Sequence, residues 1–110
     1  MNLTIEVRAK PEKFNELYQT LQALLPTMRT EYGCCESHIY RDVEDGEVFF
    51  LAIRWDKAAN LENYMRSTSG SALLGAVDLL SKAVRVRMGG DSPWEGIDVL
   101  KRMRKGTETR

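Results

Sequence analysis

Hydrophobic and polar residues alternate at the start of the chain, and the pattern then changes to a helical one. Residues 3–7 have the two-residue period of a strand with one apolar face. Pro11 is then expected to open a helix, because proline is tolerated in the first helical turn. Apolar residues at helical spacing continue from Phe14 to Met28. Within this helix, Pro26 is expected to cause a kink or an early end, because proline removes a backbone hydrogen bond.

Two strand-like segments occupy the middle of the chain. Residues 35–43 and 48–55 flank a turn sequence at Glu44–Gly46, which predicts a β-hairpin. The second segment has apolar residues on both faces, so we expect it to be a central strand of its sheet. One face carries Phe49, Leu51, Ile53 and Trp55, and the other carries Val48, Phe50 and Ala52.

The remaining pattern predicts three more helices and one more strand. Asp56 is expected to cap the helix that follows the hairpin. A second helical run at residues 72–80 follows a weak stretch at residues 67–71, and residues 83–88 alternate as a last core strand. Apolar positions in residues 94–103 predict a short amphipathic C-terminal helix.

The order strand, helix, strand, strand, helix, strand predicts an α+β fold, a ferredoxin-like βαββαβ antiparallel sheet with its helices on one face. We divide the chain into a domain at residues 1–90 and a C-terminal helical extension with a basic tail at residues 91–110. Apolar residues on the other face of the sheet would meet water unless a partner covers them. A homodimer packed sheet against sheet resolves this conflict. Changing Leu51 to lysine should then break the dimer, if Leu51 faces the partner.

The charge balance and the hydropathy argue against several classes of partner. The 110 residues hold 16 lysine and arginine side chains against 16 aspartate and glutamate side chains, so no overall field favours a nucleic acid or an anionic membrane. No apolar run approaches the roughly 20 residues of a membrane helix, and the N-terminus lacks the apolar segment of a signal peptide. We expect a cytoplasmic protein whose two adjacent cysteines remain reduced thiols.

Both cysteines and the single histidine lie in the segment YGCCESHIYRDVEDGEVFF, which begins at Tyr32. Neighbouring residues of a strand point to opposite faces, so Cys34 and Cys35 are not expected to ligate one metal ion. Cys34 and His38 are expected to share a face, but four strand residues separate their Cα atoms by about 13 Å. A β-bulge at Cys34 would change the faces without closing this distance. The spacing therefore argues against a cysteine-histidine nucleophile and against a zinc site in this strand.

Four stretches of the chain are VRAKPEKFNELYQTL, EYGC with YRDVED after it, FFLAIRWDKAANLENYMRS, and LLGAVDLLS. In this order and spacing they resemble the antibiotic biosynthesis monooxygenase superfamily, including its quinol monooxygenases. The final stretch WEGIDVLKRMRK is similar to a terminal helix that some members carry. The resemblance implies a dimeric α/β barrel. Members of this superfamily include cofactor-free oxygenases of polyphenols, haem-degrading enzymes, and proteins with no known substrate.

The chain departs from this resemblance at three polar positions. Many relatives carry a glutamate two residues before the strand tryptophan, a histidine in the following helix, and a histidine after a Ser-Pro pair. Ile53, Tyr64 and Ser69 occupy those positions here, and Trp55 is the matched tryptophan. Haem-degrading members use a histidine on the second helix. Because no histidine lies there, the resemblance argues against haem degradation.

The candidate site residues are His38 and Tyr64 for catalysis and Tyr40, Arg54 and Trp55 for substrate binding. His38 is the candidate general base, because an imidazole titrates near neutrality and can take a phenolic proton. The aromatic side chains can orient or stack on a flat aromatic substrate. Arg54 and Arg85 can attract a phenolate. A structural role stays open for each of these residues.

Two functions remain open from the sequence. The first is a cofactor-independent monooxygenase that oxidises an aromatic quinol, phenol or anthrone with dioxygen, without a metal or another cofactor, because the substrate supplies the electrons. The second is a non-catalytic dimeric protein of the same fold that binds an apolar aromatic small molecule or supports a pathway enzyme. Loss of the three polar positions favours the second function, whereas Trp55 and the complete scaffold are consistent with the first.

Overall fold

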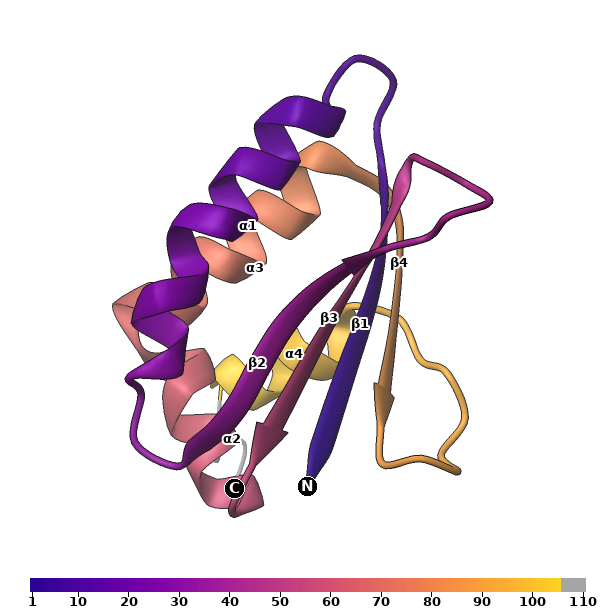
Figure 1. The fold of residues 1–110 in the computed structure, drawn as a ribbon. Helices are drawn as coiled ribbons and strands as arrows, with labels where there is room; N and C mark the ends of the chain where they lie inside the picture. The colour runs from indigo at the N-terminus through magenta and orange to yellow at the C-terminus, as the bar shows by residue number, and fades with distance from the viewer. Residues whose placement is uncertain (106–110) are drawn as a thin grey trace.

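The computed structural model describes residues 1–105 as four strands and four helices. Their order along the chain is β1 (Asn2–Ala9), α1 (Phe14–Arg29), β2 (Cys34–Arg41), β3 (Val48–Trp55), α2 (Ala58–Arg66), α3 (Thr68–Leu80), β4 (Ser81–Met88) and α4 (Asp98–Lys105). Figure 1 shows the strands as one layer, with α1 and α3 lying side by side against it.

The strands form one antiparallel sheet in the order β2-β3-β1-β4. This is the strand order of a ferredoxin-like fold, so the α+β prediction is confirmed. The predicted hairpin is the pair β2 and β3. As its two-sided apolar pattern predicted, β3 is a central strand.

The start of α1 lies later than predicted. Pro11 does not open the helix, which begins at Phe14. Between them, Glu12 has a left-handed backbone with a φ of 67°, and a right-handed helix does not continue through such a residue. The first helical turn therefore forms only after this position.

The early end expected at Pro26 is wrong, because α1 passes this residue and ends at Arg29. Tertiary contacts hold the turn beyond the proline. Met28 is buried in the core, and Arg29 Nε donates a hydrogen bond to the Ser37 carbonyl of β2 at 3.1 Å. Packing on the sheet outweighs the local cost of the missing N–H.

The corner between α2 and α3 also differs from its prediction. Asp56 does not cap the backbone of α2, because its carboxylate accepts a hydrogen bond from the Asn60 side chain. The weak stretch expected at residues 67–71 is reduced to Ser67. Its Oγ accepts a hydrogen bond from the Gly70 N–H at 3.1 Å and caps α3.

Gly70→Ala is expected to destabilise the protein by about 1–3 kcal/mol, the usual cost of overpacking. A Cβ atom here would overlap the Tyr64 carbonyl oxygen and would lie 2.8 Å from Met65 Cα, both of them backbone atoms that cannot move aside. The matched control is Gly75→Ala in the same helix, where a Cβ atom would have no atom of the described residues within 4 Å apart from the neighbouring helix backbone. Alanine is the better helix former, so this variant should be more stable by about 0.5–1 kcal/mol. Urea unfolding measures the free energy of unfolding of both variants. If both substitutions changed it in the same direction, the packing described for this corner would be contradicted.

The hydrophobic core lies between the sheet and the helices. Leu51 has 0% exposure and belongs to this core, so it does not face a partner across the other side of the sheet. The sequence left its direction open, because both faces of β3 are apolar.

Within residues 1–105 no helix lies on the opposite side of the sheet, and we call this side the open face. Strand alternation and register place these residues on it: Thr4 and Glu6 of β1, Glu36, His38 and Tyr40 of β2, Phe50, Ala52 and Arg54 of β3, and Arg85 and Arg87 of β4. Apolar Phe50 is only partly buried there. The open face is therefore more polar than the two-sided pattern of β3 alone suggested.

The C-terminal segment packs onto the same core as the preceding residues. Glu95 pairs with Val86 of β4 through two backbone hydrogen bonds of 2.7 Å, and Leu100 of α4 is 1% exposed. The predicted C-terminal helix is present as α4, but Trp94 lies outside it, in the extended segment beside β4. The part of the predicted tail beyond Lys105 lies outside the described residues.

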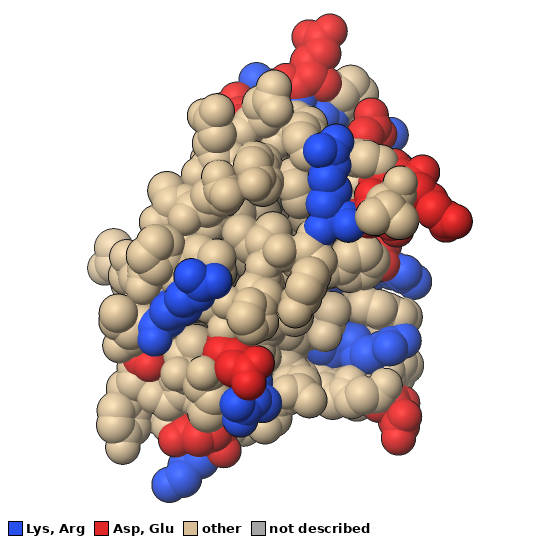
Figure 2. Space-filling view, viewed as in Figure 1, with Lys and Arg blue, Asp and Glu red and all other residues tan. Residues whose placement is uncertain are grey.

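Charges of both signs are scattered over the side of the molecule in Figure 2, where no patch of a single sign covers the sheet or the helices. This distribution agrees with the equal numbers of acidic and basic side chains in the chain. Within residues 1–105, no helix has both the length and the apolar character needed to cross a membrane.

Candidate functional site

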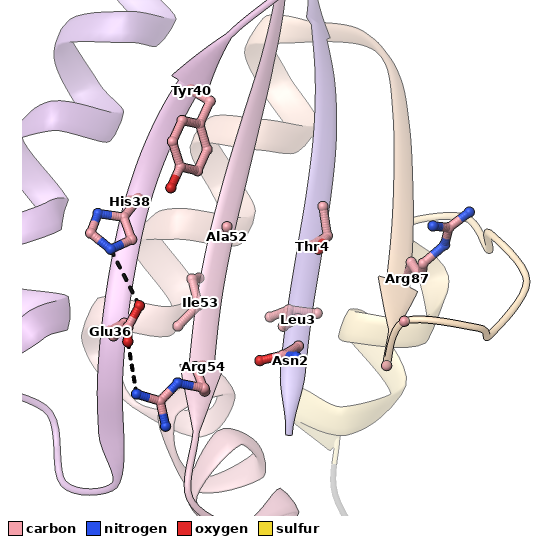
Figure 3. A pocket seen from close by; sticks show the side chains of 12 residues that line it. Asn2, Leu3, Thr4, Glu36, His38, Tyr40, Ala52, Ile53, Arg54 and Arg87 are labelled. Atoms are coloured by element: carbon pink, nitrogen blue, oxygen red, sulfur yellow. Dashed lines mark hydrogen bonds and ion pairs between the residues drawn. The ribbon is translucent and has the colours of Figure 1, made fainter.

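A pocket of about 290 Å³ lies on the open face. Its lining comes from all four strands and the turn after β4: Asn2, Leu3, Thr4, Glu36, His38, Tyr40, Ala52, Ile53, Arg54, Arg87, Gly89 and Gly90. Figure 3 shows His38, Glu36 and Arg54 at one side of this pocket and Arg87 at the other. Three of the five predicted site residues are thus brought together.

Short side chains make the floor of the pocket. Across the sheet, His38 lies opposite Ala52, Ala52 opposite Thr4, and Thr4 opposite Arg87. These four paired residues form one row across the sheet. The next row of paired residues on each side has longer side chains: Tyr40, Phe50, Glu6 and Arg85 on one side, and Glu36, Arg54 and Asn2 on the other. Three steps of about 4.8 Å between strands place the Cα atoms of His38 and Arg87 about 14 Å apart. The hollow is therefore an elongated trough with a base at one end and a cation at the other.

A chain of contacts leads from Arg54 through Glu36 to His38. His38 Nε2 lies 3.5 Å from Glu36 Oε1, and the other Glu36 oxygen accepts a hydrogen bond from Arg54 Nη2 at 2.8 Å. The Arg54 guanidinium, and to a lesser extent His38, holds the pKa of the Glu36 carboxyl below its usual value. Glu36 therefore remains a carboxylate and favours the histidine tautomer with a proton on Nε2. The second ring nitrogen is then the one that can accept a proton.

Tyr40 borders the same pocket two residues along β2. The centroid of the Tyr40 ring lies 5.9 Å from that of the His38 ring. Tyr40 is 54% exposed to solvent. A flat ligand over the Ala52 floor would therefore meet an imidazole and a phenol along one wall.

The two other predicted residues lie on the opposite side of the sheet. Trp55 and Tyr64 are 0% and 3% exposed, and their rings pack in the core with centroids 5.5 Å apart. Burial raises the pKa of the Tyr64 hydroxyl above its ordinary value. One small substrate cannot contact His38 and this pair together, because β3 lies between them. Their buried Nε1 and hydroxyl groups have no hydrogen-bond partner among residues 1–105.

Two charged residues of the pocket lining, Glu36 and Arg87, were missed by the sequence reasoning. Glu36 could have been found from strand alternation, because it lies two residues before His38 and so on the same face. Arg87 could not, because only the register of β4 distinguishes it from Arg85. Arg85 was the named candidate, but its guanidinium pairs with Glu6 at 2.6 Å and does not line the pocket.

The cysteines take no part in this pocket. The register of β2 shifts between Cys34 and Glu36, so Cys34 lies opposite Trp55 on the helix side while His38 lies on the open face. The expectation that Cys34 and His38 share a face is therefore wrong, because a bulge inserts one residue between them. Both thiols are free, and burial raises the pKa of Cys34, which disfavours its thiolate form.

Among residues 1–105, no group of three or more histidine, cysteine, aspartate or glutamate side chains could hold a metal ion.

A protein-family model described as antibiotic biosynthesis monooxygenase matches residues 1–72. Solved structures share the fold at low sequence identity. A Pseudomonas aeruginosa protein is 22% identical with a TM-score of 0.72, over 86% of this chain and 91% of that chain. A Mycobacterium tuberculosis protein is 21% identical with a TM-score of 0.71, over 83% and 95% of the two chains.

A third crystal structure, itself described as an antibiotic biosynthesis monooxygenase, is 17% identical with a TM-score of 0.74, over 84% of this chain and 98% of that chain. A search of curated proteins found no match.

Proposed function

The chain belongs to the antibiotic biosynthesis monooxygenase family, and on this premise we propose that it is a cofactor-independent monooxygenase that oxidises an aromatic quinol, phenol or anthrone with dioxygen. The observation that supports this most directly is the chain of contacts from Arg54 through Glu36 to His38 at the wall of a pocket. A carboxylate that orients an imidazole, which in turn faces a substrate site, is an arrangement suited to a general base.

In the proposed reaction, His38 takes the phenolic or enolic proton of the substrate and leaves an electron-rich anion. Arg54, which lies on the His38 side of the pocket, lowers the energy of that anion through its positive charge. The anion transfers one electron to dioxygen, and the resulting substrate radical and superoxide combine to form a carbon–oxygen bond. For an anthrone, the ring CH₂ becomes a carbonyl group that keeps one oxygen atom. The O–O bond breaks, and the second oxygen atom leaves as water with the two hydrogens, so the substrate supplies all the electrons.

A homodimer is part of the proposal, with the open faces of two copies packed together. Phe50 and Tyr40 supply apolar surface for this contact, and Phe50 is already partly buried in the single chain. Four neighbouring charges are paired within the chain, Glu6 with Arg85 at 2.6 Å and Glu36 with Arg54 at 2.8 Å, so covering these four leaves none of them isolated. A second copy would also close the pocket and exclude water from the anion.

Oxygen uptake with a panel of quinols, phenols and anthrones tests the proposal. We expect one dioxygen to be consumed per substrate, and one ¹⁸O atom from labelled dioxygen to appear in the product. The rate should be the same after treatment with a chelator and without added flavin. Absence of uptake with every member of the panel would contradict the monooxygenase activity.

The alternative is a non-catalytic dimeric protein that binds an aromatic small molecule or supports a pathway enzyme. The specific observation in its favour is that Ile53 and Tyr64, at two polar positions of many relatives, are 2% and 3% exposed in the packed core. Binding of a panel member by equilibrium dialysis without oxygen uptake would support this alternative.

A further inference from the structure

Arg87 is the pocket cation whose charge is not neutralised within the described part of the chain. The other charged side chains of the lining are Glu36 and Arg54, which pair with each other at 2.8 Å. No carboxylate of residues 1–105 lies within ion-pair distance of Arg87, and its buried Nε has no hydrogen-bond acceptor there. Its neighbour Arg85 differs, because Glu6 accepts two hydrogen bonds from it.

Trp94 holds this unpaired guanidinium in place. The ring lies against the edge strand β4, with Arg87 Cζ 4.3 Å and Arg85 Cζ 4.5 Å from its centroid. The backbone pairing of Glu95 with Val86 fixes the segment that carries the tryptophan. Stacking limits the rotamers of Arg87, so an anion that binds it loses less side-chain entropy in the process.

The substrate class follows from the two ends of the trough. We infer that the pocket takes an elongated planar phenol that also carries a carboxylate, with the phenol at His38 and the carboxylate at Arg87. The placement of the phenol at His38 rests on the proposed function. The short side chains of Ala52 and Thr4 leave room for fused rings between the ends, and the separation of about 14 Å between Cα atoms exceeds what one ring would bridge. A carboxylate on the ligand supplies the anionic partner that Arg87 lacks among residues 1–105.

Binding of two matched ligands tests this inference separately from turnover. The ligands are a dihydroxyanthraquinone and its monocarboxylic acid, which differ only in the carboxylate, and benzoate serves as the anion alone. Dissociation constants are measured by isothermal titration with the intact protein, Arg87→Gln, Arg87→Lys and the control Arg85→Gln. We expect the acid to bind about 10-fold to 100-fold more tightly than its neutral parent, as for a hydrogen bond to a charged group. Arg87→Gln should abolish this preference, Arg87→Lys should keep part of it, and Arg85→Gln should keep it in full.

Other outcomes of the binding experiment would contradict either the inference about Arg87 or the proposed aromatic substrate. Equal binding of the two anthraquinones by the intact protein, or a preference that survives Arg87→Gln, would overturn the inference while leaving an aromatic site in place. Benzoate binding that depends on Arg87, without binding of either anthraquinone, would support the anion site and contradict the proposed aromatic substrate. If no ligand binds, both are overturned. If Arg87→Gln dissociates the dimer and leaves ligand binding unchanged, Arg87 belongs to the subunit contact and the inference is wrong.

Discussion

Replacing Leu51 with lysine is expected to unfold the protein, whereas replacing its neighbour Phe50 with lysine is expected to leave each chain folded. Leu51 has 0% exposure among core side chains on the helix side, and Phe50 lies on the open face. A buried, unpaired charge together with the lost leucine contacts costs roughly 5 kcal/mol or more. The total stability of a domain of this size is about 5–15 kcal/mol, so one such change can remove most of it.

Circular dichroism and sedimentation distinguish the two variants. Under the proposed dimer, the intact protein sediments with the mass of two chains, and Phe50→Lys sediments as a folded monomer because two cations would face each other across the contact. A Phe50→Lys variant that stays dimeric would show that the copies do not associate through this face. A Leu51→Lys variant with a native spectrum and normal unfolding would contradict the placement of the core.

Replacing His38 with alanine is expected to lower turnover of a quinol or anthrone by about 10²-fold to 10⁴-fold, the usual contribution of a positioned general base. The loss should appear mainly in kcat, because the floor of Ala52 and Thr4 that contacts the substrate is unchanged. Raising the pH should partly restore the rate of the variant, since a substrate that is already deprotonated no longer needs the base.

Ser37, the residue before His38, provides the control for the His38→Ala variant. Ser37 points to the helix side of β2 and is 1% exposed, so Ser37→Ala alters the same strand without touching the pocket. It should keep turnover within about twofold, since the Ser37 Oγ has no hydrogen-bond partner among residues 1–105 that the change would remove. Equal activity of the intact protein and His38→Ala would remove His38 from the mechanism. Glu36→Gln should reduce kcat less than His38→Ala, because it only loosens the orientation of the imidazole.

Local periodicity was sufficient for the elements and their order. The alternation in residues 3–7 and the helical stripe from Phe14 to Met28 arise from side chains within a few positions of one another, and both elements are present. The exceptions are positions where a distant contact outweighs local preference. Pro26 stays inside α1 because Met28 packs in the core and Arg29 bonds to β2.

The candidate site was only partly predictable for the same reason. His38, Tyr40 and Arg54 come together as residues of paired strands, and alternation within β2 is enough to place the first two on one face. Trp55 and Tyr64 are close to each other, as expected for a strand and the following helix, but the sheet separates them from His38. No local pattern says which face of a two-sided apolar strand the helices cover.

The sequence by itself determined the ferredoxin-like order of elements, the central place of β3 and the pairing of β2 with β3, because these depend on residue periodicity and on short turns. Only the tertiary structure decided that Leu51 is core and that Arg87, rather than Arg85, lines the pocket. It also decided that Cys34 and His38 point to different faces. Side chains change faces at every strand position, so one inserted residue or one step of register reverses the assignment, and register is set by contacts between residues far apart in the chain.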